Sequence, residues 1–201
     1  MTGTVPSSSA PSGPAPSGLA PSGPAPLTAP ISEIVATRLR DVPDFPVAGV
    51  IFKDFTPLLS DGPALRAVVQ DISRRYAGQV DVIVGIEARG LILGAAVAYE
   101  LGIGFVPVRK AGKLPGETHS AEYELEYGTA VIEIHADAFT GGKRALVMDD
   151  VLATGGTAEA ACELVERAGA SVEAVEVVLE LGFLHGRSKL TGRPVHAILS
   201  L

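Results

Sequence analysis

From residue 31 onward, short apolar runs take turns with segments whose apolar residues recur at helical spacing. Six apolar runs are predicted to be strands, and they cover residues 80–86, 104–108, 129–135, 144–149, 172–180 and 195–199. These runs show little polar alternation, so both faces of each strand are expected to be buried. Such strands, joined by helices, are typical of a mostly parallel sheet with helices on both faces. The chain is therefore predicted to have an α/β fold.

Proline and glycine mark where the intervening helices begin and end. A stripe from Leu65 to Tyr76 follows Pro63, and proline favours the first turn of a helix. Gly102 and Gly169 follow two further helical segments, which begin near residues 90 and 157. Because glycine commonly ends helices, both segments are predicted to stop there.

Residues 1–30 differ in composition from the rest of the chain. Pro, Ser, Gly and Ala dominate, the string APSGPAP occurs twice, and no side chain is charged. Such a segment has too little apolar surface to offset the entropy of ordering, so it is predicted to be a disordered tail. It lacks the basic start and apolar run of a secretory signal, so a cytoplasmic protein is expected. Residues 31–201 are predicted to form one domain.

Composition argues against several kinds of site in that domain, namely disulfides, metal sites, membrane helices and nucleic-acid surfaces. The single cysteine, Cys162, excludes an internal disulfide, and the four histidines lack metal-ligand spacing. No run approaches the roughly 20 apolar residues of a membrane helix. The net charge of −7 disfavours nucleic acid as a partner.

Two adjacent acids, Asp149 and Asp150, close one apolar strand and precede the loop VLATGGT at 151–157. Ligands of parallel sheets bind beyond the carboxyl ends of strands. Gly155 and Gly156 let the loop turn its N–H groups inward, and the following helix adds its positive dipole end, so the loop suits a phosphate. Nearby carboxylates can accept hydrogen bonds from sugar hydroxyls. A ribose 5-phosphate would therefore fit both the loop, through its phosphate, and the two acids, through its hydroxyls.

A simpler interpretation is that Asp150 caps a turn and the two glycines only shape a tight connection. Two common nucleotide motifs do not account for the loop. It lacks the Gly-Lys-Ser/Thr of a Walker loop, and the GGK at 141–143 precedes a strand. The dinucleotide fingerprint G-x-G-x-x-G is also missing.

The stretch VMDDVLATGGTA at 147–158 resembles the phosphoribosyl diphosphate (PRPP) signature of the type I phosphoribosyltransferases. Three further stretches resemble the adenine phosphoribosyltransferases among them: DFPVAGVIFKDFTPLL at 44–59, GIEARGLILGAAVA at 85–98 and RKAGKLPGETHSAEYELEYG at 109–128. The resemblance covers residues 31–201. It implies the type I fold with a central, mostly parallel sheet, a small hood and a flexible catalytic loop. It also implies that adenine and PRPP give AMP and pyrophosphate.

The resemblance assigns PRPP to the loop and its neighbours. The 5′-phosphate would bind Ala153, Thr154, Gly155, Gly156 and Thr157. Asp149 and Asp150 would hold the ribose hydroxyls, and Arg89 would contact the pyrophosphate. A cis peptide is implied between Glu87 and Ala88. Mg²⁺ would be bound through PRPP, with no direct protein ligand.

The charged segment 109–128 is too long and polar for a simple hairpin connection, so it is predicted to be an active-site lid. Arg109, Lys110 and Lys113 would bind PRPP, although charge alone equally fits a solvated surface. The resemblance implies a homodimer in which Arg109 reaches the pyrophosphate of the neighbouring subunit.

The stretch FPVAGVIFKD is predicted to form the hood that recognises the base. A purine needs an apolar slot with a few polar groups at its edge. The resemblance assigns adenine contacts to Ile51, Phe52 and Lys53, although many relatives have arginine in place of Lys53, and lysine lacks the planar fork. The alternative is that these apolar residues are core, and Phe45 is expected to be buried there.

The stretch EYELEYG at 122–128 supplies the last candidates. If it is extended, its three glutamates lie on one side, and a solvated strand face would explain them. The resemblance instead makes Glu126 the proton acceptor for the base and lets Tyr127 close over the ligand.

Two other functions remain open at this stage. One is a phosphoribosyltransferase for xanthine, hypoxanthine or orotate. The other is a regulator on the same fold that binds PRPP, which the acidic chain and the absence of a preceding helix-turn-helix segment disfavour.

Overall fold

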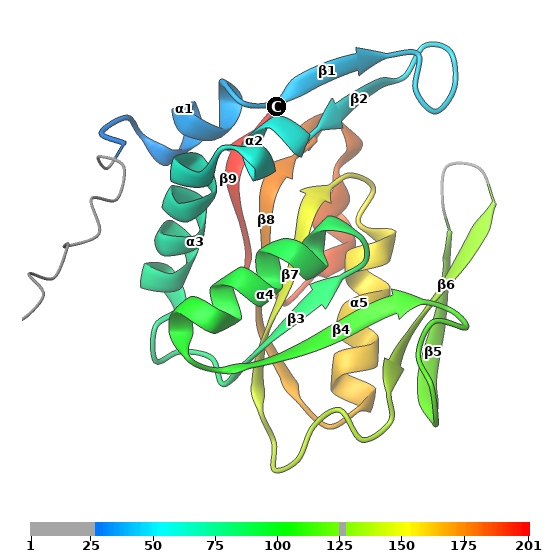
Figure 1. Cartoon of the computed structure of the whole chain (residues 1–201). Coiled ribbons are helices and arrows are strands. Elements are labelled where there is room, and N and C mark those ends of the chain that lie inside the picture. The colour runs from blue at the N-terminus through cyan, green and yellow to red at the C-terminus, as the bar shows by residue number, and fades with distance from the viewer. Residues whose placement is uncertain (1–26, 125–127) are drawn as a thin grey trace, which may run out of the picture.

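The computed structural model describes residues 27–124 and 128–201, and its centre is a seven-stranded sheet in the order β5-β6-β4-β3-β7-β8-β9. The strands are β3 (Val82–Ile86), β4 (Gly104–Lys110), β5 (Thr118–Glu124), β6 (Thr129–His135), β7 (Arg144–Leu152), β8 (Ser171–Glu180) and β9 (Val195–Ser200). Strands β4, β3, β7, β8 and β9 are parallel to one another. All six predicted strands are present, and the predicted α/β class is confirmed (Figure 1).

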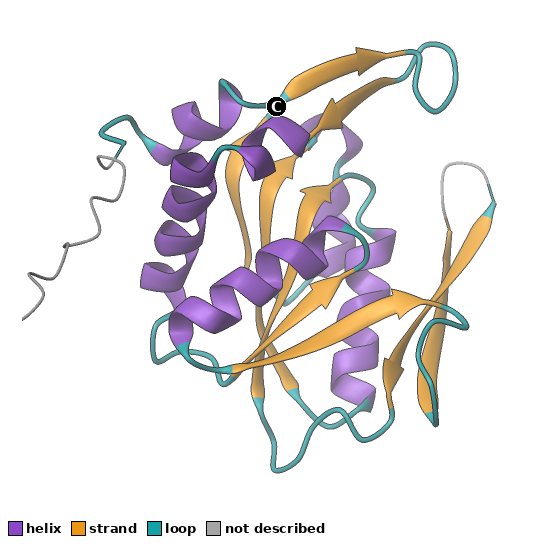
Figure 2. Ribbon diagram, viewed as in Figure 1, coloured by secondary structure: helices purple, strands orange, loops and turns teal. Residues whose placement is uncertain are grey.

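Helices cover both faces of this sheet, as Figure 2 shows. They are α1 (Ile31–Ala36), α2 (Thr56–Ser60), α3 (Gly62–Tyr76), α4 (Arg89–Leu101) and α5 (Gly156–Arg167), with short 3-10 helices η1 (Gly182–Leu184) and η2 (Gly186–Leu190). Helices α3 and α4 pack on one face, and α5 packs on the other. No helix in the described part of the chain is long and apolar enough to cross a bilayer.

Alternate residues of the central strands supply two separate cores. Ile83 and Met148 pack against α3 and α4. Val84 and Val147 point the opposite way and pack against α5. Because successive strand side chains point to opposite faces, a strand covered on both sides must be apolar throughout. This explains the uninterrupted apolar runs of the sequence.

Local signals set the helix ends. The Asp61 carboxylate accepts a hydrogen bond from the backbone N–H of Ala64 at 3.1 Å, which caps α3, and Pro63 lies in its first turn. Helix α4 ends at Gly102, whose φ of 67° is left-handed. The predicted ends of these helices are confirmed.

Three features depart from the sequence prediction. Strand β6 is antiparallel to β4 and β5, because no helix connects these three strands. The segment predicted as a lid loop contains β5, so its second half is a strand paired with β6. A separate antiparallel hairpin, β1 (Arg40–Pro43) and β2 (Ile51–Asp54), lies beyond the sheet and was not predicted (Figure 1).

The predicted disordered tail falls almost wholly on residues 1–26, which lie outside the described residues. The first described helix begins at Ile31, with Pro30 as its N-cap residue.

The parallel strands end at one edge of the sheet. Strands β3, β4 and β7 are neighbours in register, so residues 87–90, 109–113 and 149–157 follow one another along that edge. This edge carries most of the predicted site residues.

Candidate active site

Asp149 and Asp150 lie near the carboxyl end of β7, as predicted. The Arg89 guanidinium at the start of α4 donates a hydrogen bond from Nε to Oδ2 of Asp150, whose side chain is only 7% exposed. The backbone N–H of Asp150 donates to Oδ1 of Asp149 at 2.8 Å. Burial raises the pKa of Asp149 well above its ordinary value, and the Asp150 carboxylate raises that pKa further. Asp149 therefore has a raised pKa, while the Asp150 carboxylate is bound by the Arg89 guanidinium.

The loop after these acids turns sharply into α5. Gly155 is the N-cap residue with a φ of 85°, a left-handed conformation that suits glycine. Ala153, Thr154, Gly155 and Thr157 line a cavity, as expected for ligand-binding residues. Gly156 is not among the lining residues, and a Cβ added to it would lie 3.1 Å from the backbone oxygen of Glu124 on β5. A helix N-terminus at this position presents backbone N–H groups and a positive dipole to an anion.

The hood is the β1–β2 hairpin. The Asp44 carboxylate accepts the backbone N–H of Gly49 at 2.7 Å, and Gly49 has a φ of 88°, so the connection turns tightly. Phe45 was expected in the core, which is wrong, because its side chain is 52% exposed. Its ring instead packs edge-on against Phe52, with centroids 5.2 Å apart. The hairpin is a separate two-stranded sheet beyond the main one (Figure 1), and Phe45 lies in the connection between its strands.

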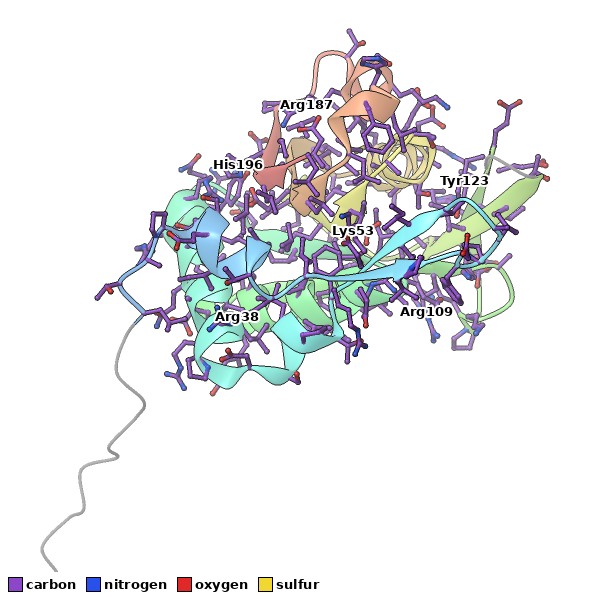
Figure 3. The ribbon with its side chains drawn as sticks, turned by 90° about the horizontal axis from the view of Figure 1, so that it is seen from above. Arg38, Lys53, Arg109, Tyr123, Arg187 and His196 are labelled. Atoms are coloured by element: carbon purple, nitrogen blue, oxygen red, sulfur yellow. The ribbon has the colours of Figure 1, made fainter. Side chains whose placement is uncertain are left out.

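The three predicted base contacts lie on this hairpin. Ile51, Phe52 and Lys53 all line the same cavity as the loop. The Lys53 ammonium pairs with Asp41 of the neighbouring strand at 2.7 Å, so its charge is already partnered (Figure 3). The guanidinium carbon of Arg89 lies 5.4 Å from the centroid of the Phe52 ring, a cation–π contact. Arg89 thus touches both the hood and Asp150.

The cavity has a volume of about 1080 Å³ and is mostly apolar. Its walls come from the hood, from residues 149–158 and from a C-terminal segment that was not among the predicted site residues. That segment contributes Leu181, Phe183, Leu184 and Leu201. Leu181, Phe183 and Leu184 follow the end of β8, so the rule that ligands bind at strand ends was the signal that could have found them. A cavity with these walls can bury a flat ring while the N-terminus of α5 binds a phosphate.

The basic residues at the base of the predicted lid gather around one acid. The Glu87 carboxylate accepts the backbone N–H of Lys110 at 3.1 Å and Nε–H of Arg109 at 3.3 Å. Lys113 Nζ lies 3.8 Å from the other oxygen of Glu87. The backbone bond from Lys110 is the main reason that the pKa of Glu87 is lowered, and the Arg109 side chain adds to it. The implied cis peptide between Glu87 and Ala88 is confirmed.

A second acid, Glu133, binds the predicted lid segment at residues 113 and 114, and it was not among the predicted site residues. Its buried carboxylate accepts the backbone N–H groups of Lys113 and Leu114 at 2.9 and 2.8 Å. Burial raises the pKa of Glu133, but the backbone N–H groups outweigh burial and leave that pKa below its ordinary value. An acid inside the apolar run 129–135 was the only sequence signal.

Glu126 and Tyr127 lie outside the described residues. The strand before them shows the predicted alternation, because Glu122 and Glu124 are exposed while Tyr123 packs toward α5. Among the described residues, no group of three or more His, Cys, Asp or Glu side chains could hold a metal ion.

Fold and site together define a class, an α/β protein with one mostly apolar cavity that is lined by a hairpin, by Asp149 and by the loop at the start of α5. The family model for the phosphoribosyl transferase domain matches residues 60–191. An adenine phosphoribosyltransferase of Salinispora tropica is 62% identical over 172 residues, which cover 85% of this chain and 91% of the relative. The chain belongs to the phosphoribosyltransferases, and among them to the adenine phosphoribosyltransferase family.

Solved structures agree with this placement. The adenine phosphoribosyltransferase of Thermoanaerobacter pseudethanolicus is 47% identical with a TM-score of 0.81, and the match covers 84% of this chain and 99% of that one. The Saccharomyces cerevisiae enzyme, solved with adenine and an imino-altritol bisphosphate, is 40% identical with a TM-score of 0.80. That match covers 84% of this chain and 98% of the yeast chain. The predicted type I fold is thereby confirmed.

Proposed function

We propose that this chain converts adenine and PRPP to AMP and pyrophosphate in purine salvage. The observation that carries the proposal is one cavity lined both by the hood and by the loop at the start of α5. A nucleotide has the same two ends, an apolar ring and a phosphate. The names of the relatives support adenine as the base.

The residues of the cavity then divide the work. The loop 153–157 and the α5 N-terminus bind the 5′-phosphate, while Asp149 and Asp150 accept hydrogen bonds from the 2′- and 3′-hydroxyls of the ribose. Adenine N9 forms a bond to C1′ as the bond from C1′ to pyrophosphate breaks, and C1′ becomes cation-like between the two. The acids lie on the ribose side, where negative charge stabilises that cation.

The leaving pyrophosphate needs positive charge, and two sources lie at this edge. Arg89 is held between Asp150 and the Phe52 ring of the hood. Lys113 and Arg109 are held around Glu87, the residue before the cis peptide, and in the proposed homodimer Arg109 would reach the pyrophosphate of the neighbouring subunit. Catalysis is then mainly the positioning of these groups in advance of the reaction. Glu126 is proposed to take the N7 proton of the attacking base.

The donor set of this site fits Mg²⁺ bound through PRPP. Mg²⁺ keeps several waters and binds substrate phosphates. No side chain is proposed to bind the ion directly, and Asp149 and Asp150 would hold the ribose hydroxyls of the PRPP that carries it. When bound, the ion neutralises charge that develops on the departing diphosphate.

The base preference is the sharpest test of the proposal. A backbone carbonyl near Ile51 would accept a hydrogen bond from the amino group of adenine but would face the oxygen of hypoxanthine, leaving two acceptors opposed. Incubation with Mg²⁺, PRPP and each base separately, followed by identification of the nucleotides, should give AMP and far less product from hypoxanthine. Equal turnover of adenine and hypoxanthine would contradict the proposed base site.

A homodimer is also proposed. Helix α4 exposes a stripe of apolar side chains, Ile92, Ala95 and Tyr99, at helical spacing. Tyr99 is 88% exposed, which is unusual for an aromatic side chain on a stable surface. Light scattering on the purified protein should give twice the chain mass, and Tyr99→Glu should shift the protein toward the monomer. The cytoplasmic location expected from the sequence stays a prediction.

A further inference from the structure

The short helix η2 begins at Gly186, whose backbone lies directly against residues 153–155 of the loop. A Cβ added to Gly155 would clash with the backbone oxygen of Gly186, and its distance to Gly186 Cα would be 3.1 Å. A Cβ added to Gly186 would clash with the backbone oxygen of Ala153 and would lie 3.0 Å from the backbone nitrogen of Gly155. The two backbones therefore touch with no side chain between them.

The glycine at position 186 is explained by this contact and not by its own conformation. Its φ lies outside the left-handed region, so an alanine there would be unstrained in a free chain. Gly155 does have a left-handed φ of 85°, so its conformation and its contact both require glycine. The requirement at Gly186 thus comes from the loop that it touches.

An ion pair between the nearly buried Glu180 and the half-exposed Arg187 connects η2 to the end of β8. Arg187 donates from Nε and Nη2 to the two carboxylate oxygens of Glu180, at 2.6 and 2.8 Å, and from Nη1 to the backbone oxygen of Val195 at 2.6 Å. Ser200 Oγ donates to the same carboxylate at 3.0 Å. Arg187 stands on the segment after β8 in the view from above (Figure 3). Planar two-point bonding of this kind fixes direction as well as distance, so it restrains the residue next to Gly186.

We propose that Gly186 is a positioning residue for the 5′-phosphate of the substrate. Its backbone supports residues 153–155 from behind, and this support keeps the loop N–H groups converged on the phosphate. Gly186 lies outside the phosphate-loop signature, 31 residues after Gly155. The inference rests on the proposed role of the loop 153–157 in binding the phosphate.

The test compares ligands with and without a phosphate. In Gly186→Ala, the added methyl group pushes the loop outward, so AMP affinity should fall about ten- to a hundredfold, as expected when binding groups move by about 1 Å. Adenosine carries no phosphate and should bind Gly186→Ala and wild type equally. Dissociation constants for both ligands would be measured by calorimetry, together with melting temperatures. Gly62→Ala is the matched control, since a Cβ at Gly62 meets no atom within 4 Å.

The outcomes separate the inference from the proposed function. Unchanged AMP affinity in Gly186→Ala, or an equal loss for AMP and adenosine, overturns the positioning role. Thr157→Ala removes a loop hydroxyl directly, so unchanged AMP affinity in Thr157→Ala would overturn the proposed phosphate site and this inference with it. A loss in Thr157→Ala without one in Gly186→Ala overturns the inference alone.

A second variant applies if Gly186→Ala does not fold. Arg187→Lys keeps the charge beside Glu180 but loses the fork and the bond to Val195. It should weaken AMP binding by a smaller factor and leave adenosine binding unchanged. Wild-type AMP affinity in a folded Arg187→Lys protein would overturn the inference.

Discussion

Replacing Asp150 by Asn tests how the paired acids act. Asparagine has the shape of aspartate, and its side-chain oxygen can still accept the hydrogen bond from Arg89 Nε. The side chain at this position is 7% exposed, and its carboxylate pairs with Arg89. The fold should therefore survive, with a melting temperature close to that of the wild type.

The expected loss of activity follows from the lost charge. A hydrogen bond to a charged group contributes about 1.5–3 kcal/mol. If Asp150 holds a ribose hydroxyl, removing its charge should lower kcat/KM for PRPP by about 10- to 150-fold. Initial rates at varied PRPP, with adenine and Mg²⁺ saturating, would measure this loss.

The pH profile gives a second and more specific result. Burial and the charge of Asp150 both raise the pKa of Asp149. A group that must be ionised for activity loses that activity as the pH falls through its pKa. Asp150→Asn removes one of the two causes, so the pKa of Asp149 falls and the acid limb of kcat/KM should move to lower pH. Burial remains, so that pKa should stay above the ordinary value for aspartate.

Two results would refute this reasoning. One is a kcat/KM for PRPP equal to that of the wild type, which would remove Asp150 from ribose binding. The other is an acid limb that stays in place or moves to higher pH, which would mean that Asp149 does not control it.

Further predictions concern two glutamates, Glu124 and Glu126, and residues 1–26. Glu126→Leu should lower kcat by about 10²- to 10⁴-fold with little change in KM for PRPP, as expected for lost acid–base help. Glu124→Leu removes an equal charge two residues away and is the control, so equal kinetics in the two variants would exclude Glu126 as proton acceptor. Removing residues 1–26 should leave kcat and the melting temperature nearly unchanged, because that segment has little to bury. A melting temperature lowered by many degrees would mean that the segment packs on the domain.

The sequence by itself was sufficient for the parallel strands of the sheet and for the position of the two acids. A strand covered on both faces must be apolar throughout, so β3 and β7 are visible as uninterrupted apolar runs. Parallel strands end at one edge, so the position of Asp149 in the chain already placed it near the loop 153–157. The parallel strands and the position of the two acids depend on residues that are close together in the chain, so the order of residue types is enough to predict them.

The resemblance to known phosphoribosyltransferases predicted site features that the hydrophobic pattern of the sequence does not contain. The cis peptide at Glu87 and the base contacts on the hood came from matched motifs, and the structure bears out the first. Local hydrophobicity failed at Phe45, because an apolar residue is buried only where another layer covers it. Phe45 lies in the connection between β1 and β2, which is not part of the main sheet.

Only the tertiary structure decided which distant residues touch. Glu87 meets Arg109 across 22 residues, and Glu133 meets Lys113 across 20, because β4 lies beside β3 and β6. Gly186 meets Gly155 because β8 returns the chain to the edge where β7 ends. Each contact depends on the positions of two strands in one sheet, and no local pattern around either residue contains that information. The residue types at this site could therefore be read from the chain, while the way each one is held in place follows from the packing of the sheet.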